Sequence, residues 1–186
     1  MRIERRWDGS LGVMQTLPRT AIIATSPDPA SRSRVLAGVA ADKLAQRSHP
    51  ADLLDLRDHP LPAYAPGILQ DSRIQNARDM LHGATSVLFA LPIYNWDVNA
   101  AAKNLIEWVG EELTGKTVGF LCAAGGHHSY MSVLPFANSL MLDFRCWIVP
   151  RFVYAVGEDF SGGRLVSESV DQRIAELVET VLNGRG

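Results

Sequence analysis

The stretch Ser86-Val-Leu-Phe-Ala-Leu91 is apolar at every position after the first and is followed directly by Pro92. A strand that is apolar on both of its faces is typical of a parallel sheet covered by helices on both sides. Proline lacks the N–H that a strand ladder needs, so we expect this strand to end at Leu91. The stretch therefore predicts a central strand of an α/β protein.

Four other runs have the composition of strands, and five segments carry apolar residues at helical spacing. The last strand-like run contains Pro150, which predicts an edge strand or a bend at that residue. Pro135 fits its helix only in the first turn. The strand-like runs are 20–25, 51–56, 117–124 and 146–156, and the helical segments lie near 35–47, 74–83, 99–109, 132–144 and 170–181.

This alternation predicts a doubly wound, three-layer α/β fold, because crossovers between parallel strands are right-handed in nearly all proteins. Five strands favour a five-stranded parallel sheet in the flavodoxin-like order 2-1-3-4-5. In such sheets the ligand binds beyond the carboxyl ends of the strands, where the strand order reverses. The loops after Thr25, Leu91 and Ala124 are therefore the ones expected to carry the function.

Composition excludes several classes of protein. The chain has 186 residues, a net charge of -2, 47% hydrophobic and 20% charged residues, which is the balance of one ordinary globular domain. A near-neutral charge argues against nucleic-acid binding, and no apolar run is long enough to span a membrane. Cys122 and Cys146 each lie in an apolar stretch, which fits buried thiols in the cytoplasm.

Residues 1–19 lack the apolar core of a signal peptide. We expect them to form an N-terminal arm that is disordered or loosely docked, or alternatively one that packs on a partner subunit. Residues 20–186 are then the folded domain.

The first loop, Ser26-Pro-Asp-Pro-Ala-Ser-Arg-Ser-Arg34, places three hydroxyl groups where a strand meets a helix. The start of a helix exposes unpaired N–H groups and the positive end of the helix dipole. Ser26, Ser31 and Ser33, with charge added by Arg32 and Arg34, therefore predict a phosphate cradle; the alternative is a plain helix cap, which needs one serine rather than three. No G-x-G-x-x-G is present, so a dinucleotide pyrophosphate is not indicated.

The second loop, Pro92-Ile-Tyr-Asn-Trp-Asp-Val-Asn99, puts Tyr94 and Trp96 at the expected ligand crevice. Aromatic rings there can stack on a planar ligand, or they can cap the core. In the third loop, Gly125 and Gly126 permit close approach of a ligand to the backbone.

Three other motifs are rejected. His127 and His128 have no third ligand at a metal-site spacing, so no metal is predicted. Cys122 with His127 lacks an activating partner for a nucleophile. Residues 110–117 match the phosphate-loop pattern G-x-x-x-x-G-K-[ST], but a helix is expected before them and a strand after them, the reverse of what that motif requires.

Together the loops resemble the NAD(P)H-dependent FMN reductase family of flavodoxin-like flavoproteins. The first family motif, G-S-x-R-x-x-S-x-[ST], is matched by Thr25-Ser-Pro-Asp28-Pro-Ala-Ser31-Arg-Ser33. The second, P-x-Y-N followed by L-K-N-x-x-[DE]-W, is matched by Pro92-Ile-Tyr-Asn95 and Ala102-Lys-Asn-Leu-Ile-Glu-Trp108. Gly125-Gly126 matches the third motif, a glycine-rich turn. Asp28 replaces the family arginine, and Asn99-Ala100 replaces a usual proline and glycine.

The resemblance implies bound FMN and the use of NAD(P)H, with a hydride passed from nicotinamide to flavin and two electrons then passed to a quinone, a flavin or a similar small-molecule acceptor. It also implies a homodimer or homotetramer. A hydride transfer needs no side chain as acid or base, so no catalytic residue is assigned, and the two cysteines in apolar stretches indicate the cytoplasm. The resemblance places Ser26, Ser31, Arg32 and Ser33 at the phosphate, Pro92, Ile93, Tyr94 and Asn95 along the isoalloxazine ring, and Gly125, Gly126 and His127 near its pyrimidine edge.

Two alternatives remain open at this stage. A flavodoxin-like electron carrier is usually strongly acidic, unlike this chain. A flavin-free regulatory domain of the receiver type needs an acidic pair after the first strand, where this chain has Ala24-Thr-Ser26.

Overall fold

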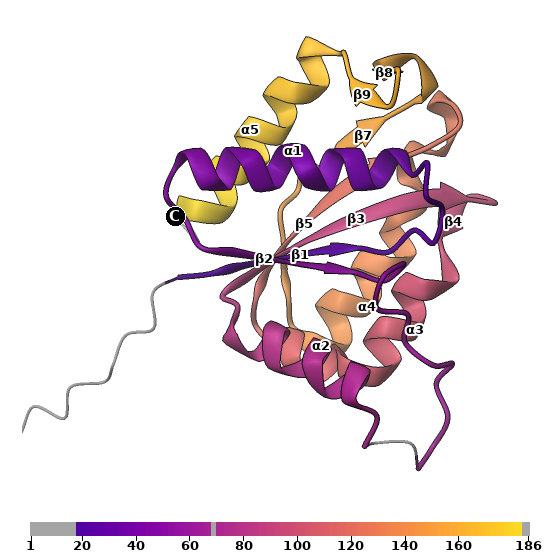
Figure 1. Ribbon diagram of the computed structural model, residues 1–186, viewed down its shortest axis with the longest axis vertical. Coiled ribbons are helices and arrows are strands. Elements are labelled where there is room, and N and C mark those ends of the chain that lie inside the picture. Colours follow the sequence, from indigo (N-terminus) through magenta and orange to yellow (C-terminus); the bar gives the residue numbers. More distant parts are fainter. Residues whose placement is uncertain (1–17, 68–69, 184–186) are drawn as a thin grey trace, which may run out of the picture.

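The computed structural model describes residues 18–67 and 70–183. The expected arm, residues 1–19, lies outside the described residues except for its last two, so it stays a prediction. The described chain forms three layers, with α1 and α5 on one face of a central sheet and α2, α3 and α4 on the other (Figure 1).

The central sheet has the order β2-β1-β3-β5, and the short strands β6 and β7 both pair with β5 at the far edge. All of these pairings are parallel. The predicted order 2-1-3-4-5 is confirmed, with the fifth strand divided in two around Pro150. The strands are β1 (Thr20–Ala24), β2 (Ala51–Asp55), β3 (Ser86–Tyr94), β5 (Thr117–Ala123), β6 (Trp147–Ile148) and β7 (Val153–Ala155).

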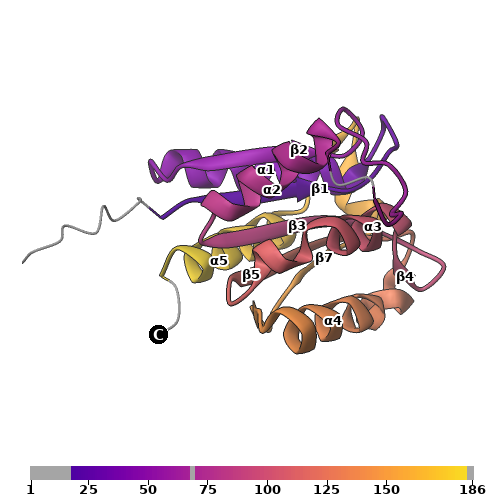
Figure 2. The ribbon, with the colours of Figure 1, turned by 90° about the horizontal axis from the view of Figure 1, so that it is seen from below.

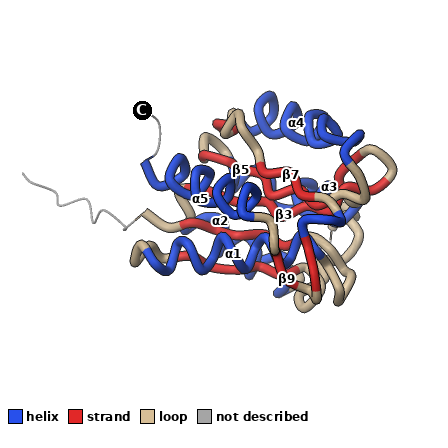
Figure 3. Tube along the Cα trace, turned by 90° about the horizontal axis from the view of Figure 1, so that it is seen from above, coloured by secondary structure: helices blue, strands red, loops and turns tan. Residues whose placement is uncertain are grey.

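The described part of the chain contains five α-helices, in the predicted order between and after the strands, and Figures 2 and 3 show them from the two sides of the sheet. Pro135 lies in the first turn of α4, as expected. Within the described ranges, none of these helices is long and apolar enough to cross a membrane. The helices are α1 (Arg32–Gln46), α2 (Ser72–Gly83), α3 (Ala100–Val109), α4 (Leu134–Phe144) and α5 (Glu168–Asn183), with short 3-10 turns η1 (Gly110–Leu113), η2 (His127–Val133) and η3 (Gly157–Asp159).

Two details differ from expectation. Strand β3 continues through Pro92 to Tyr94, because Pro92 lies opposite Ala123, the last residue of β5, where its missing N–H costs little. The extended end of β3 forms a hairpin with β4 (Asp97–Val98). A second hairpin, β8 (Phe160–Ser161) with β9 (Arg164–Leu165), is too short to show a period in the sequence.

Alternating side chains of each strand fill two separate cores. Ile22 and Leu88 pack beneath α1 and α5, whereas Ile23 and Phe89 pack against the helices of the opposite face. All four are fully buried. Packing on both faces fixes the strands, and so it fixes the loops that leave the carboxyl ends of β1, β3 and β5.

Candidate functional site

The three loops singled out in the sequence meet at one hollow beyond the carboxyl ends of β1, β3 and β5. Its volume is about 740 Å³, within the range of roughly 300–1,000 Å³ typical of small-molecule sites. The residues lining it are Asp28, Ala30, Ser31, Arg32, Ser33, Pro92, Ile93, Tyr94, Asn95, Ala123, Ala124 and Gly125.

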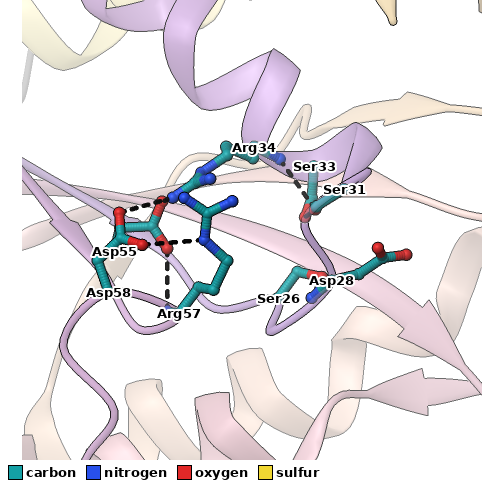
Figure 4. A network of polar contacts seen from close by, with 8 residues as sticks. All are labelled: Ser26, Asp28, Ser31, Ser33, Arg34, Asp55, Arg57 and Asp58. Atoms are coloured by element: carbon teal, nitrogen blue, oxygen red, sulfur yellow. Dashed lines mark hydrogen bonds and ion pairs between the residues drawn. The ribbon is translucent and has the colours of Figure 1, made fainter.

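The serine loop is built around the start of α1. Ser31 caps the helix: its hydroxyl accepts a hydrogen bond from the amide of Arg34 at 3.2 Å and lies 3.0 Å from the Ser33 hydroxyl (Figure 4). Both serines are buried. The amides of Arg32 and Ser33, in the first turn, have no partner within the helix and are therefore available to a ligand.

The two arginines near the start of α1, Arg32 and Arg34, have different partners. Arg34 turns away from the serines and pairs with Asp55, at the end of β2, and with Asp58 at 3.0 Å (Figure 4). Hydrogen bonds from Arg57 and Arg34 hold the pKa of Asp58 below its usual range. Arg32 stays exposed, with its guanidinium carbon 5.9 Å from the centre of the Phe160 ring.

The β3–β4 hairpin turns at Asn95 and Trp96, whose φ angles are 51° and 63°. This left-handed conformation is the one that a two-residue hairpin turn requires, and it is strained for a bulky side chain. Tyr94 is 48% exposed and Trp96 is 67% exposed. These exposures favour the expectation that the rings are available to a ligand over the alternative that they cap the core.

A buried pair of polar side chains joins the first loop to the hairpin. The Thr25 hydroxyl donates to Asn99 Oδ1 at 2.7 Å, and Asn99 Nδ2 donates to the Thr25 carbonyl at 2.7 Å. Thr25 follows β1, and Asn99 precedes α3, so the pair fixes one loop against the other. Sequence reasoning noted Asn99 only as a departure from the family, because no local pattern shows which distant residue a buried amide will meet.

The glycine turn provides open space. A Cβ atom added to Gly125 or Gly126 would meet no atom within 4 Å. Tyr154, on β7, supports this turn from below: its hydroxyl donates to the Gly126 carbonyl at 2.5 Å and lies 2.8 Å from Ser129 Oγ. The glycines therefore keep the hollow open, while Tyr154 holds the position of their backbone.

A smaller hollow of about 370 Å³ adjoins the first. It shares Ile93, Asn95 and Gly125 with the larger hollow, and Trp96 and Gly126 are among its other lining residues. The exposed indole of Trp96 thus belongs to the smaller hollow, next to the residues that the two spaces share.

Two of the residues expected at the site line neither hollow. Ser26 is buried under its loop, where its hydroxyl accepts the Asp28 amide at 3.3 Å. His127 is exposed, and its Nε2 lies 3.2 Å from a carboxylate oxygen of Glu158. Ala30, Ala123 and Ala124 line the hollow without having been predicted, because small apolar residues carry no chemical signal in a sequence.

The three motifs set aside in the sequence can be placed in the structure. Within residues 18–67 and 70–183, no three His, Cys, Asp or Glu side chains are grouped so that they could hold a metal ion. Complete burial raises the pKa of Cys122 above that of an ordinary thiol, which disfavours the thiolate form that a nucleophile needs. Residues 110–117 run from the end of α3 into β5, the reverse of a phosphate loop.

Comparison with known proteins agrees with the family resemblance found in the sequence. An NAD(P)H-dependent FAD/FMN reductase of Geobacillus thermodenitrificans (strain NG80-2) is 26% identical over 136 residues, 70% of this chain and 73% of its own length. Among solved structures, the flavoenzyme NAD(P)H:(acceptor) oxidoreductase FerB of Paracoccus denitrificans superposes with a TM-score of 0.75 at 17% identity, covering 90% of this chain and 96% of its own. An NAD(P)H:quinone oxidoreductase of Methanothermobacter marburgensis gives 0.64 at 14% identity, covering 89% and 99%.

The family description that matches the chain is "NADPH-dependent FMN reductase", and the match extends over residues 18–161. This range includes all three loops of the hollow and most of the sheet. The chain belongs to the NADPH-dependent FMN reductase family.

Proposed function

We propose that this protein is an NAD(P)H-dependent, FMN-containing oxidoreductase that passes a hydride from nicotinamide to flavin and then two electrons to a quinone, a flavin or a similar small acceptor. The observation that carries the proposal is the single hollow formed by the serine loop, the aromatic hairpin and the glycine turn. Its relatives by sequence and fold include a flavin reductase and a quinone oxidoreductase by name.

The residues present fit a flavin. Ser31, Arg32 and Ser33 offer hydroxyl, guanidinium and amide donors at one end of the hollow, and Ser26 holds the shape of their loop. At the other end the space beside Gly125 and Gly126, free of atoms within 4 Å of an added Cβ, suits the edge of a flat ring. Pro92, Ile93, Tyr94 and Asn95 line the wall between these ends, and we place His127 near the pyrimidine edge, outside the hollow.

Bound FMN supplies the two-electron chemistry, and the protein supplies position and electrostatics. No side chain has to move a proton in a hydride transfer, so we assign no catalytic residue. The backbone amides of the glycine turn stabilise negative charge at the pyrimidine edge. Trp96 and the smaller hollow offer an exposed aromatic wall for the nicotinamide and for the electron acceptor in turn.

We also propose a homodimer or homotetramer working in the cytoplasm. Support for self-association comes from exposed apolar side chains on and beside α4, namely Met131, Leu134, Met141, Leu142 and Trp147. Light scattering of the purified protein measures the assembly directly, and a monomer at micromolar concentration would contradict this part of the proposal.

The test combines an absorption spectrum with a plug in the hollow. The purified protein should bind FMN and oxidise NADH or NADPH rapidly when a quinone is added. Gly125→Leu should abolish FMN binding, because it fills the hollow where no neighbouring atom stands in the way. Gly38→Leu is the matched control, since Gly38 is an exposed position of α1 that also has no atom within 4 Å of an added Cβ.

Three results would contradict the proposal in different ways. A protein that binds no flavin at all is a flavin-free domain. One that binds FMN without oxidising either nicotinamide is an electron carrier. Equal FMN binding by Gly125→Leu and Gly38→Leu would place the flavin outside this hollow.

A further inference from the structure

We propose that the site does not select for the 5′-phosphate, so that riboflavin and FMN bind with similar affinity. This inference rests on the proposed function and names its flavin substrate class more sharply. It comes from the way the serine end of the hollow uses its own polar groups.

The serine loop carries a carboxylate into the hollow. Asp28 lines the space, and its Oδ1 accepts the amide of Ala30 at 2.8 Å, so the loop satisfies one of its own anion-binding donors (Figure 4 shows Asp28). The Ser26 hydroxyl is engaged by the Asp28 amide at 3.3 Å. A phosphate placed there would meet the negative charge of Asp28, and the Ala30 amide, which already donates to that carboxylate, would not be free to bind it.

The cations that could offset this charge are few. Among the residues lining the hollow, Arg32 is the one cation and Asp28 the one carboxylate, so their formal charges cancel. Arg34, two positions further along α1, is engaged by Asp55 and Asp58. The positive end of a helix adds only about half a unit charge, whereas a phosphate monoester carries roughly −1.5 to −2 at neutral pH.

The free donors do not distinguish a phosphate from a hydroxyl. The amides of Arg32 and Ser33 can bond the terminal hydroxyl of riboflavin as well as a phosphate oxygen. The ring end, with Tyr94 and the open space beside Gly125, is common to both flavins. Affinity therefore comes chiefly from the ring, which is the part that riboflavin and FMN share.

The experiment measures dissociation constants of FMN and riboflavin for the purified full chain by flavin fluorescence. We expect the two constants to differ by less than tenfold. Asp28→Asn keeps an oxygen for the Ala30 amide but removes the charge, and it should tighten FMN about tenfold, as roughly one unit charge a few Å away predicts. Riboflavin binding should stay within about twofold, because it carries no charge at that end.

Asp42→Asn is the matched control, since it makes the same change in net charge at an exposed position of α1, fourteen residues after Asp28. It should leave both constants unchanged. FMN binding more than about tenfold tighter than riboflavin in the unaltered protein, an FMN affinity unmoved by Asp28→Asn, or an equal shift of both flavins would overturn the inference while leaving the reductase proposal intact. A chain that binds neither flavin overturns both.

Discussion

The two ends of the hollow use their side chains in opposite ways. At the serine end, Ser31 and Ser33 are buried and bonded to their own loop and to each other, and Asp28 closes on Ala30. At the ring end, Tyr94 and Trp96 are exposed on a strained turn. The comparison teaches that polar residues in a loop can serve the hydrogen bonds of the fold itself. Exposed aromatic side chains, which the fold does not use, are the ones left available to a ligand.

The largest effect is expected where the two ends are joined. Asn99→Ala removes both bonds to Thr25 and leaves a buried carbonyl without its partner. We expect a loss of about 2 kcal/mol in the free energy of unfolding and weaker FMN binding, because both loops loosen. Thermal unfolding and an FMN titration measure the two. Thr25→Ser keeps the hydroxyl and should lose much less stability. Equal stability of the unaltered protein and the two variants would show that the two ends of the hollow are independent.

The ring end can be loosened by itself. Tyr154→Phe removes the bond to the Gly126 carbonyl and the contact with Ser129 Oγ. A hydrogen bond of about 1 kcal/mol corresponds to roughly a fivefold loss of FMN affinity if the turn must be held in place for binding. Tyr64→Phe, on a half-exposed ring elsewhere, is the control. If both variants bind FMN equally, the glycine turn is held by other contacts.

Trp96 offers a test in which stability and function should move in opposite directions. Trp96→Gly relieves the left-handed strain and should raise stability by about 0.5 kcal/mol after the entropy of glycine is counted. It should also raise KM for the nicotinamide or the quinone. Ser48→Gly relieves a similar φ of 53° far from the hollow. Ser48→Gly should gain stability with unchanged kinetics; a KM unaffected in Trp96→Gly would remove the indole from the site.

The smallest effect is expected at the amino end of the sheet, away from either end of the hollow. Burial lowers the pKa of His49 below its ordinary value of 6.5, and its Nε2 lies 2.9 Å from the Thr20 hydroxyl. The folded state thus binds fewer protons there than the unfolded chain, so this stability is present above pH 6.5 and is lost as the pH falls below it. The stability of His49→Gln, measured by unfolding curves, should depend less on pH than that of the unaltered protein. The FMN affinities of the two proteins should change with pH in the same way.

The order of strands and helices followed from sequence because buried strands such as 86–91 and the apolar helix stripes repeat with fixed periods. The loops that meet at the hollow followed from that order. What escaped prediction depends on contacts between distant residues: the Thr25–Asn99 pair, the diversion of Arg34 to Asp55, and the position of His127 beside Glu158. None of these leaves a local pattern, since each partner is set by the folded path of the chain.

The burial of both cysteines has a practical consequence. Burial raises the pKa of Cys146 to about 11, and that of Cys122 is raised further. At neutral pH only about one Cys146 in ten thousand is ionised, and the thiolate is the form that reacts with maleimides and alkylating reagents. A reporter dye can therefore be attached to a cysteine engineered at Trp96 while both native thiols stay in place, which makes ligand entry at the rim directly observable.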